Sequence, residues 1–402
     1  MRILMVNKFL YLKGGSETYM IKLGNYLSTI GHEVQYFGMD SENRCVGNNV
    51  SAYVANMDFH DKGRLKKLGY VFKSIYSFEA RKKIRLVLDD FQPDVVHLNN
   101  FNYQLTPSVI LEIVRWRKKN KRGCRIIYTA HDGQLICPNH RLRNPKTKQN
   151  CEKCLYGAYI NCIKGKCIHN SISRSVIGTI EAFYWKNRHV YRNIDTIICC
   201  SAFYKAKLEC NRQIAGRTVL IHNFVDKVVQ EPVQKKNYVL YFGRYSEEKG
   251  IKTLAEACKQ LQEVQFIFAG SGPLEEMIEN VPNIVNVGFK SGVELENLIK
   301  EAKFSICPSE WYENCPFSVM ESLMMGTPVL GSRIGGLPEL IVDGETGELF
   351  ESGNLNELVK KIRLIWSNEN LLKKYTKNCH ERINNDLEAY GEKLMNCYLN
   401  KD

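Results

Sequence analysis

The sequence predicts an α/β protein built from two domains, each a largely parallel sheet covered by helices. Short apolar stretches recur along the chain, and glycine-containing turns and helical segments separate them. This alternation is typical of strand–helix–strand units, which form parallel sheets. A chain of 402 residues is long enough for two such domains, each with its own hydrophobic core.

We expect the first domain at residues 1–226 and the second at 227–383. A polar stretch without clear periodicity, Asp226 to Lys236, is the predicted linker. A final helix over about Asn384–Leu399 carries apolar residues at helical spacing. The strands expected in the first domain are Ile3–Val6, Val34–Phe37, Val95–Leu98, Arg125–Thr129, Thr196–Cys200 and Thr218–Ile221.

In the second domain, the strand Tyr238–Phe242 is apolar throughout, as buried parallel strands are. Gly243, Arg244 and Lys249 follow it. A glycine turn lets the backbone approach a ligand closely, and two cations beside such a turn can bind a diphosphate.

Two further strands of this domain lead into polar loops. Gln265–Ala269 is followed by Gly270, and Ser305–Pro308 is followed by an acidic loop. Ligands in open α/β sheets bind outside the carboxyl ends of the strands. The basic, glycine and acidic groups are therefore expected at one edge of one sheet.

The acidic loop contains Glu313, and Glu321 follows eight residues later inside a predicted helix. Pro316 is tolerated in a first turn, Ser318–Met325 has apolar residues at helical spacing, and Gly326 suits the helix end. Backbone N–H groups at the helix start would point outward, where the helix dipole is positive. Such a site suits an anion with hydroxyl groups beside it, and a nucleotide sugar has both features.

These segments, in order, resemble the glycosyltransferases of family 4, also described as glycosyl transferases group 1. The matching motifs of the second half are GRYSEEKG, AGSGP, ENCPFSVME, GTPVLGSRIGGLPE and DGETGELF. The first half matches through RILMVNKFLYLKGGSE, HEVQYF, PDVVHLNN and YTAHDGQLICPN. The resemblance implies the GT-B fold, two facing Rossmann-like domains with a cleft between them, and a final helix that returns to the first domain.

The resemblance also implies the roles of single residues. It places Gly14 and Gly15 over the donor diphosphate and His131 against the donor sugar, while Arg244 and Lys249 neutralise the leaving diphosphate. Catalytic roles are expected for His131, Arg244, Lys249 and Glu313. The expected donor-binding residues are Gly14, Gly15, Gly243, Arg244, Lys249, Gly270, Asn314, Cys315, Pro316, Phe317, Ser318, Val319 and Glu321.

The expected reaction is retaining transfer of a hexose from a UDP- or GDP-sugar to a saccharide or lipid-linked acceptor, in cell-surface polysaccharide synthesis. No cofactor is expected for the chemistry, because no DxD-like metal clamp is apparent. Two alternatives remain open: a GT-B sugar-nucleotide epimerase and a non-catalytic subunit that binds nucleotide sugars.

The charge of the chain is unevenly distributed. Residues 1–200 contain 32 Lys and Arg against 15 Asp and Glu, whereas residues 201–402 contain 24 against 28. The basic excess lies in Asp61–Arg85, which also carries aromatic residues, and in Arg115–Arg125. Basic amphipathic segments suit an anionic membrane surface, and we find no nucleic-acid motif. We expect a cytoplasmic protein, peripheral at the inner face of the cell membrane, without a membrane-spanning helix.

Fifteen cysteines in a cytoplasmic chain are expected to remain reduced. Cys151 and Cys154 have the two-residue gap that lets two thiolates bind one metal ion. Cys162 and Cys167 could complete a structural zinc site, with Cys137, His140 or His169 as substitutes. Free thiols in a loop and an iron–sulfur cluster are the alternatives.

Overall fold

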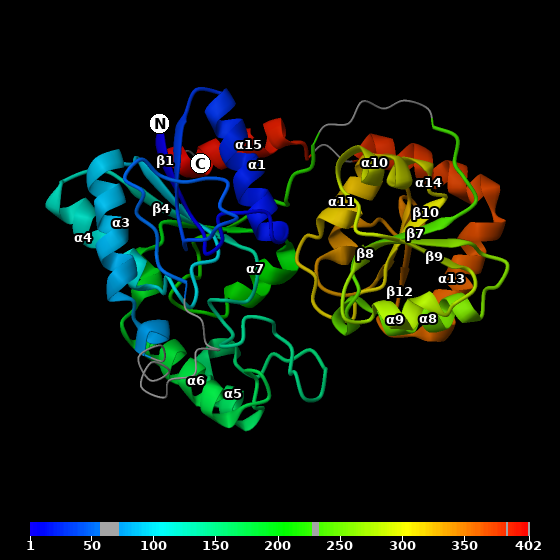
Figure 1. Cartoon of the computed structure of the whole chain (residues 1–402), viewed down its shortest axis with the longest axis horizontal. Coiled ribbons are helices and arrows are strands. Elements are labelled where there is room, and N and C mark those ends of the chain that lie inside the picture. The colour runs from blue at the N-terminus through cyan, green and yellow to red at the C-terminus, as the bar shows by residue number, and fades with distance from the viewer. Residues whose placement is uncertain (57–71, 227–232, 383–384, 401–402) are drawn as a thin grey trace. The chain divides into compact units, whose positions relative to one another are not determined.

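The structure is a computed structural model that describes residues 1–402 except 57–71, 227–232, 383–384 and 401–402. The chain divides into two units, residues 1–222 with 390–402, and residues 223–389 (Figure 1). The boundaries expected from the sequence were 226 and 384. Most of the expected linker, residues 227–232, lies outside the described residues.

The first unit contains a six-stranded parallel sheet with the order β2-β1-β3-β4-β5-β6. All six strands coincide with predicted ones to within a residue or two at each end. Its strands are β1 (Arg2–Val6), β2 (Glu33–Phe37), β3 (Val95–Leu98), β4 (Arg125–Ala130), β5 (Thr196–Cys199) and β6 (Thr218–Leu220). Its helices are α1 (Gly15–Thr29), α3 (Phe78–Phe91), α4 (Ser108–Lys119), α5 (Ile160–Lys164), α6 (Ile172–Asn187), α7 (Ala202–Leu208) and α15 (Leu387–Leu399), whose first three residues belong to the second unit.

The second unit contains another six-stranded parallel sheet, with the order β12-β11-β10-β7-β8-β9. Its strands are β7 (Val239–Arg244), β8 (Phe266–Ser271), β9 (Ile284–Gly288), β10 (Phe304–Cys307), β11 (Val329–Ser332) and β12 (Gly347–Phe350). Its helices are α8 (Ile251–Lys259), α9 (Glu275–Glu279), α10 (Gly292–Glu301), α11 (Phe317–Met324), α12 (Leu337–Leu340), α13 (Leu355–Ser367) and α14 (Glu369–Arg382).

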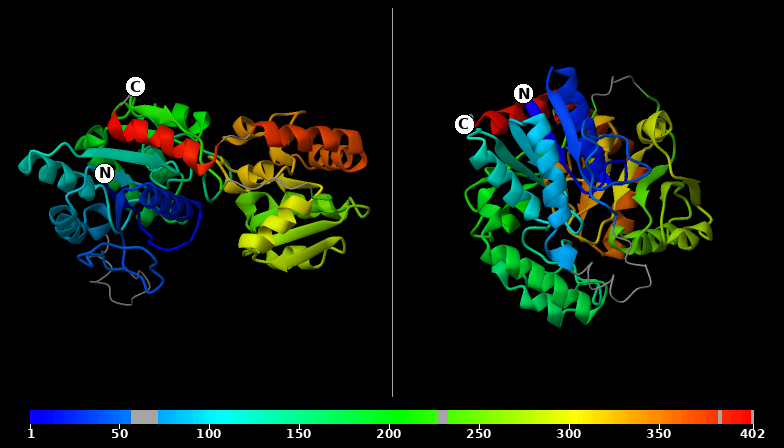
Figure 2. Two further views of the ribbon diagram at one scale, coloured as in Figure 1. Left: turned by 90° about the horizontal axis from the view of Figure 1, so that it is seen from above. Right: turned by 60° about the vertical axis from the view of Figure 1, so that its left-hand side comes forward.

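Helices cover both faces of the second sheet (Figures 1 and 2). Because alternate side chains of a strand point to opposite faces, β7 contributes to two separate cores. Val239 and Tyr241 pack in a core with residues of α8 and α13, whereas Tyr238 and Leu240 pack with residues of α10. The sequence of β7 is therefore apolar because both faces of the strand are buried.

The last helix, α15, packs on the first unit through two buried tyrosines. The hydroxyl of Tyr390 hydrogen-bonds to that of Tyr19 in α1, and the hydroxyl of Tyr398 lies 2.6 Å from Nδ1 of His97 in β3. Both tyrosines are at most 2% exposed. The chain therefore returns to the first unit after completing the second.

Candidate functional site

The order of strands in the second sheet reverses between β7 and β10, which are neighbours although three helices and two strands separate them in sequence. Open parallel sheets bind ligands at such a point, outside the carboxyl ends of the strands. The loop after β7 carries Lys249, and the loop after β10 carries Glu313. The predicted cation and acid thus follow the two strands that flank the reversal.

Lys249 and Glu313 are in direct contact. The Lys249 Nζ donates to Oε1 of Glu313 at 2.6 Å, and the same oxygen accepts from Nε1 of Trp311 at 2.8 Å and from the hydroxyl of Ser309. The ammonium also lies 5.3 Å from the centre of the Trp311 ring. Glu313 is 5% exposed, so three donors hold its buried carboxylate in one position.

The two partners keep each other charged. Burial, the largest single effect, would lower the pKa of Lys249, but attraction to Glu313, Cys307 and Glu248 together with the hydrogen bond to Glu313 raises that pKa. Burial alone would raise the pKa of Glu313, but the Lys249 charge and the three hydrogen bonds lower it. Mutual attraction of this kind favours the charged form of both side chains.

Two glycines bring the loops together. Gly250 has φ +74°, and a Cβ there would lie 1.9 Å from the carbonyl oxygen of Pro308. Gly335 has φ +59°, and a Cβ there would lie 2.2 Å from the carbonyl oxygen of Glu313. Only glycine fits these two positions, because the backbones touch and φ is positive.

The helix α11 begins at Phe317, with Pro316 as its N-cap residue, close to the predicted start. Asn314 and Ser318 are half-buried, and Glu321 lies inside the helix, as expected. Cys315 is buried: its Sγ and its carbonyl oxygen accept from the Asn223 backbone N–H and side-chain amide at 3.3 and 2.9 Å. Cys315 therefore supports the loop through its side chain and can offer a ligand only its backbone.

The other predicted residues of this unit have differing surroundings. Arg244, the last residue of β7, is exposed, and among the described residues its side chain forms no ion pair. Val319 is 1% exposed and belongs to the core. A Cβ at Gly270 would lie 1.9 Å from the carbonyl oxygen of Gly243, so close packing between β7 and β8 is sufficient to explain Gly270.

In the first unit, the predicted glycine loop precedes α1. Gly14 is the N-cap residue and Gly15 the first residue of the helix. Backbone N–H groups at a helix start can in general bind an anion. The buried Glu17 stands nearby, and its Oε1 accepts from Nδ2 of Asn7 at 3.1 Å.

His131 follows β4 and is held by two neighbours. Its Nε2 lies 2.9 Å from Oδ1 of Asn99, and its ring stands edge-on to that of Tyr19, with centres 4.8 Å apart. Burial lowers the pKa of His131 to about 3, so the ring is neutral at physiological pH.

The sequence analysis did not identify the side chains that hold Glu313 and His131 in position. Ser309 and Trp311 fix Glu313, and Asn99 and Tyr19 fix His131. Their positions in the sequence could have suggested them, because Ser309 and Trp311 share the loop of Glu313 and Asn99 follows a strand. His97 lies near His131, and the hydroxyl of Thr129 contacts both the His97 ring and the Tyr19 hydroxyl.

The described residues contain no three His, Cys, Asp or Glu side chains that are arranged to hold a metal ion. The predicted ligands Cys151, Cys154, Cys162 and Cys167 are all free thiols, of which Cys154 and Cys162 are buried. Nor is any helix of the described chain long and apolar enough to cross a bilayer.

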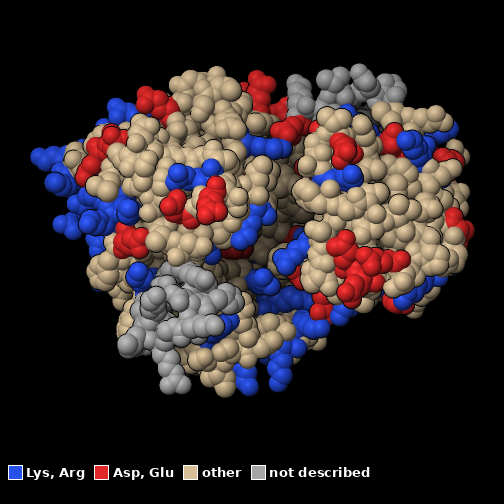
Figure 3. Space-filling view, viewed as in Figure 1, with Lys and Arg blue, Asp and Glu red and all other residues tan. Residues whose placement is uncertain are grey.

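The basic runs are partly engaged within the protein. Part of the first run, residues 61–71, lies outside the described residues. Arg81 and Arg85 both bind the buried carboxylate of Glu112, and Arg122 binds Asp94 at 3.0 Å. Figure 3 shows Lys and Arg gathered over the end of α4, while Asp and Glu gather on the face of the second unit.

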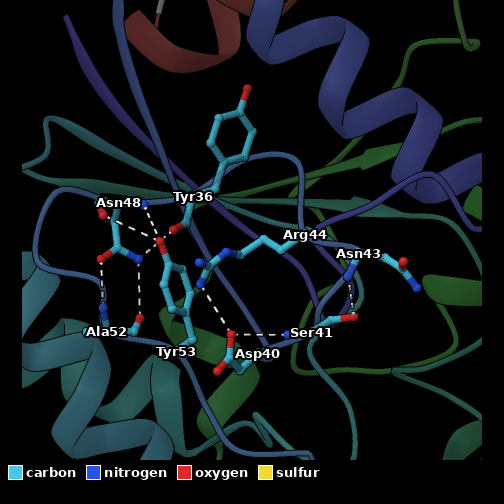
Figure 4. Close-up of polar contacts among 8 residues, drawn as sticks. All are labelled: Tyr36, Asp40, Ser41, Asn43, Arg44, Asn48, Ala52 and Tyr53. Atoms are coloured by element: carbon cyan, nitrogen blue, oxygen red, sulfur yellow. Dashed lines mark hydrogen bonds and ion pairs between the residues drawn. The ribbon is translucent and has the colours of Figure 1, made fainter.

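A separate hollow of about 390 Å³ lies beside β2 in the first unit. Arg44 lies 3.7 Å above the ring of Tyr53 and 3.2 Å from Asp40, and Asn48 binds Tyr36 and Ala52 (Figure 4). These side chains bind one another, and none of the predicted site residues lines the hollow.

Two family models match the chain. The model described as Glycosyltransferase Family 4 matches residues 13–228, and the model described as Glycosyl transferases group 1 matches residues 224–382. The first match alone covers more than half of the 402 residues.

Curated relatives are glycosyltransferases or proteins of polysaccharide gene regions. The chain is 30% identical over 220 residues to the uncharacterized glycosyltransferase MJ1178 of Methanocaldococcus jannaschii, covering 53% of this chain and 61% of that protein. It is 23% identical over 361 residues to an uncharacterized 42.6 kDa protein in the cps region of Klebsiella pneumoniae, covering 85% of this chain and 87% of that protein. It is 23% identical over 227 residues to the putative colanic acid biosynthesis glycosyltransferase WcaL of Escherichia coli, covering 50% of this chain and 56% of that protein.

Solved structures share the fold at low sequence identity. Sucrose-phosphate synthase of Thermosynechococcus elongatus aligns with a TM-score of 0.70 at 18% identity, over 99% of this chain and 98% of that one. Anabaena Alr3699/HepE, in complex with UDP, aligns with a TM-score of 0.68 at 16% identity over the whole of both chains. The two parallel six-stranded sheets with their helices are those of the GT-B fold.

Proposed function

The chain belongs to the GT-B glycosyltransferases of the Glycosyltransferase Family 4 and group 1 models, and from this premise we propose its reaction. It transfers a sugar from a UDP- or GDP-sugar to a saccharide or lipid-linked acceptor and retains the anomeric configuration. The similar HepE structures contain UDP or UDP-glucose, which supports a nucleotide sugar as donor. The relatives from cps and colanic acid biosynthesis support a role in cell-surface polysaccharide synthesis.

The observation that carries the proposal is the ion pair between Lys249 and Glu313 at the strand-order reversal. As the bond between sugar and diphosphate breaks, negative charge builds on the leaving group. Lys249 and the exposed Arg244 neutralise that charge, with backbone N–H groups at the start of α11. Stabilisation of developing charge by fixed donors is usually the largest catalytic contribution.

The acids bind the hydroxyl groups of the donor. Oε1 of Glu313 accepts all three protein hydrogen bonds, which leaves Oε2 for a hydroxyl of the sugar. Glu321, one helical turn into α11, accepts from the ribose. His131, which burial keeps neutral, is assigned a contact with the donor sugar. No protein nucleophile is needed if the acceptor attacks on the side of the leaving group and the departing phosphate takes its proton.

Replacement of Lys249 tests the assignment. Lys249→Ala should lower kcat by about 10²-fold or more, the usual effect of losing one charge-stabilising donor. Lys252→Ala is the matched control, because Lys252 is a nearby exposed lysine paired with Glu247. The measurement is release of the nucleoside diphosphate from a panel of UDP- and GDP-sugars, with and without acceptor. Near-normal turnover of Lys249→Ala would contradict the assignment.

The proposed chemistry needs no divalent cation, because cationic side chains and backbone N–H groups supply the stabilising charge. Full activity in the presence of EDTA is the expected result, measured in the same assay.

We also propose that the protein associates peripherally with the anionic inner face of the cell membrane, where a lipid-linked acceptor would be found. The basic surface of the first unit supports this location.

A further inference from the structure

The last helix, α15, has no part in the chemistry proposed above, yet it places two tyrosines in the interior of the first unit. Tyr390 and Tyr398 are 0% and 2% exposed, and the hydroxyl of each contacts another buried polar group. Gly391 allows α15 to lie close to α1, because a Cβ there would be 2.4 Å from the ring of Tyr26 (Figure 1). The end of the chain therefore brings two hydroxyl groups into the core of the first unit.

These two tyrosines are the ends of one row of buried polar contacts. The Tyr398 hydroxyl lies 2.6 Å from Nδ1 of His97, and Nε2 of the same ring lies 2.7 Å from the Thr129 hydroxyl. The Thr129 hydroxyl lies 3.1 Å from that of Tyr19, which in turn contacts the hydroxyl of Tyr390. Side chains of α15, β3, β4 and α1 thus form a continuous polar row, and each of the five is at most 2% exposed.

The polar row is held together by hydrogen bonds between neutral groups. Burial, with a smaller repulsion from His131, lowers the pKa of His97 to about 3. Burial also raises the pKa of each of the three tyrosines of the row. A buried hydroxyl without a partner costs free energy, so the position of each member of the row restricts the position of the next.

The middle of the polar row lies against the candidate catalytic histidine. Thr129 is two residues before His131, at the end of β4, and the ring of Tyr19 stands edge-on to that of His131, with centres 4.8 Å apart. Asn99, whose Oδ1 lies 2.9 Å from Nε2 of His131, follows β3, the strand that carries His97. The side chain that packs on His131 is therefore itself a member of the row.

Packing alone does not account for these polar side chains. Phenylalanine at the three tyrosine positions would fill almost the same space and would not need a partner for a buried hydroxyl. Replacing both partners of a buried hydrogen bond by apolar groups of the same shape can be nearly neutral for stability. What the hydrogen bonds add is direction, because they fix the Tyr19 ring and with it the surface on which His131 packs.

We propose that Tyr390 and Tyr398 of α15 are positioning residues for the sugar transfer. They act through the polar row on Tyr19, which holds the ring of His131 in the orientation needed for its contact with the donor sugar. The inference rests on the proposed function for the role of His131, whereas the row itself is a feature of the first unit. Tyr390 contacts Tyr19 directly, so its hydroxyl has the larger effect.

The test removes one hydroxyl at a time and leaves the ring in place. Tyr390→Phe and Tyr398→Phe are compared with Tyr238→Phe, because the buried Tyr238 hydroxyl of the second unit donates to the carbonyl oxygen of Leu298 at 2.7 Å. Each variant loses a buried hydrogen bond, so each should melt at a lower temperature than the wild type.

Only the α15 variants should lose turnover, measured as release of the nucleoside diphosphate. Tyr390→Phe should lower kcat by about tenfold or more, because small displacements in an active site are costly. Tyr398→Phe should lower kcat less, and KM for the donor should stay near its wild-type value in both. Wild-type kcat in folded Tyr390→Phe, or an equal loss in Tyr238→Phe, would overturn the proposal.

A second measurement follows His131 itself and needs no turnover. In protein that contains isotope-labelled histidine, the NMR signals of the His131 ring are those absent from His131→Asn. They should shift in Tyr390→Phe and keep their wild-type positions in Tyr238→Phe. Unshifted His131 signals in Tyr390→Phe would overturn the positioning role even in an active enzyme. A wild type that releases no nucleoside diphosphate from any UDP- or GDP-sugar would instead overturn the transfer reaction, and the NMR comparison would still decide whether α15 positions His131.

If Tyr390→Phe does not fold, Tyr398→Phe and the wild type still decide. Because both ring nitrogens of His97 have a close neighbour, this ring should hold a single tautomer, which the nitrogen chemical shifts report. The His97 signals are those absent from His97→Asn. An average of two tautomers, or protonation of His97 near the ordinary pKa of about 6.5, would show that the polar row is not fixed and would overturn the proposal.

Discussion

At the scale of single residues, the site depends on buried polar side chains that hold one another. Glu313 is fixed by a lysine, a serine and a tryptophan, and His131 by an amide and an aromatic edge. Sequence motifs predicted roles for Lys249 and Glu313, and the resemblance to family 4 predicted one for His131; all three follow strands. The motifs did not identify Ser309, Trp311 or Asn99, because supporting residues need proximity in space and not a fixed spacing.

Buried histidines should make the protein less stable in acid. Burial and repulsion from His131 lower the pKa of His97 to about 3, whereas an unfolded histidine titrates near 6.5. The unfolded chain therefore binds the proton first, and stability is lost as pH falls below 6.5. Each such histidine should cost about 2 kcal/mol between pH 7 and pH 5.

The measurement is the free energy of unfolding by denaturant as a function of pH. His97→Asn should be less stable at pH 7, because two buried hydrogen bonds are lost, but should lose less stability on acidification than the wild type. His189→Asn serves as control: His189 is exposed and has φ +50°, which Asn tolerates. Parallel pH curves for His97→Asn and the wild type would contradict the assignment.

At the scale of elements, two loops at adjacent strand ends bring Lys249 and Glu313 of the candidate site together. The strands were predictable because β7 and β10 are short apolar runs, and the start of α11 was predictable from Pro316. The close approach of the two loops was not, because it depends on backbone contacts at Gly250 and Gly335. The sequence shows only that glycines occur there.

Gly250 and Gly344 offer a matched test of this contact. Both have φ +74°, but a Cβ at Gly250 would meet the Pro308 carbonyl, whereas a Cβ at Gly344 would meet nothing within 4 Å. Alanine at Gly344 should cost about 1 kcal/mol through its conformation alone. Alanine at Gly250 should cost more and should also lower kcat, since it moves Lys249 away from β10. Equal losses of unfolding free energy in the two variants would contradict the close contact.

At the scale of the whole molecule, the charge asymmetry predicts membrane association. Lys118 and Lys119 end α4 and form no ion pair among the described residues. Each lysine near an anionic surface contributes about 1 kcal/mol, so reversing both charges should weaken binding about tenfold or more. High salt should weaken it further, because salt screens exposed charges.

The measurement is co-sedimentation with phosphatidylcholine vesicles, with and without phosphatidylserine. Lys118→Glu with Lys119→Glu is compared with Lys373→Glu and Lys377→Glu, an equal charge change at exposed positions of α14 in the second unit. Equal binding of the two double variants, or no preference of the wild type for phosphatidylserine, would contradict the proposed surface.

The sequence by itself determined the class of fold, the positions of the strands and the residues that follow them. It could do so because burial on both faces imposes apolar runs, and because a turn after a strand demands glycine or polar residues. The order of the strands and the contact of Lys249 with Glu313 were decided only by the tertiary structure. Each of these depends on which distant segments pack together, and packing is a property of the folded chain that local spacing does not encode.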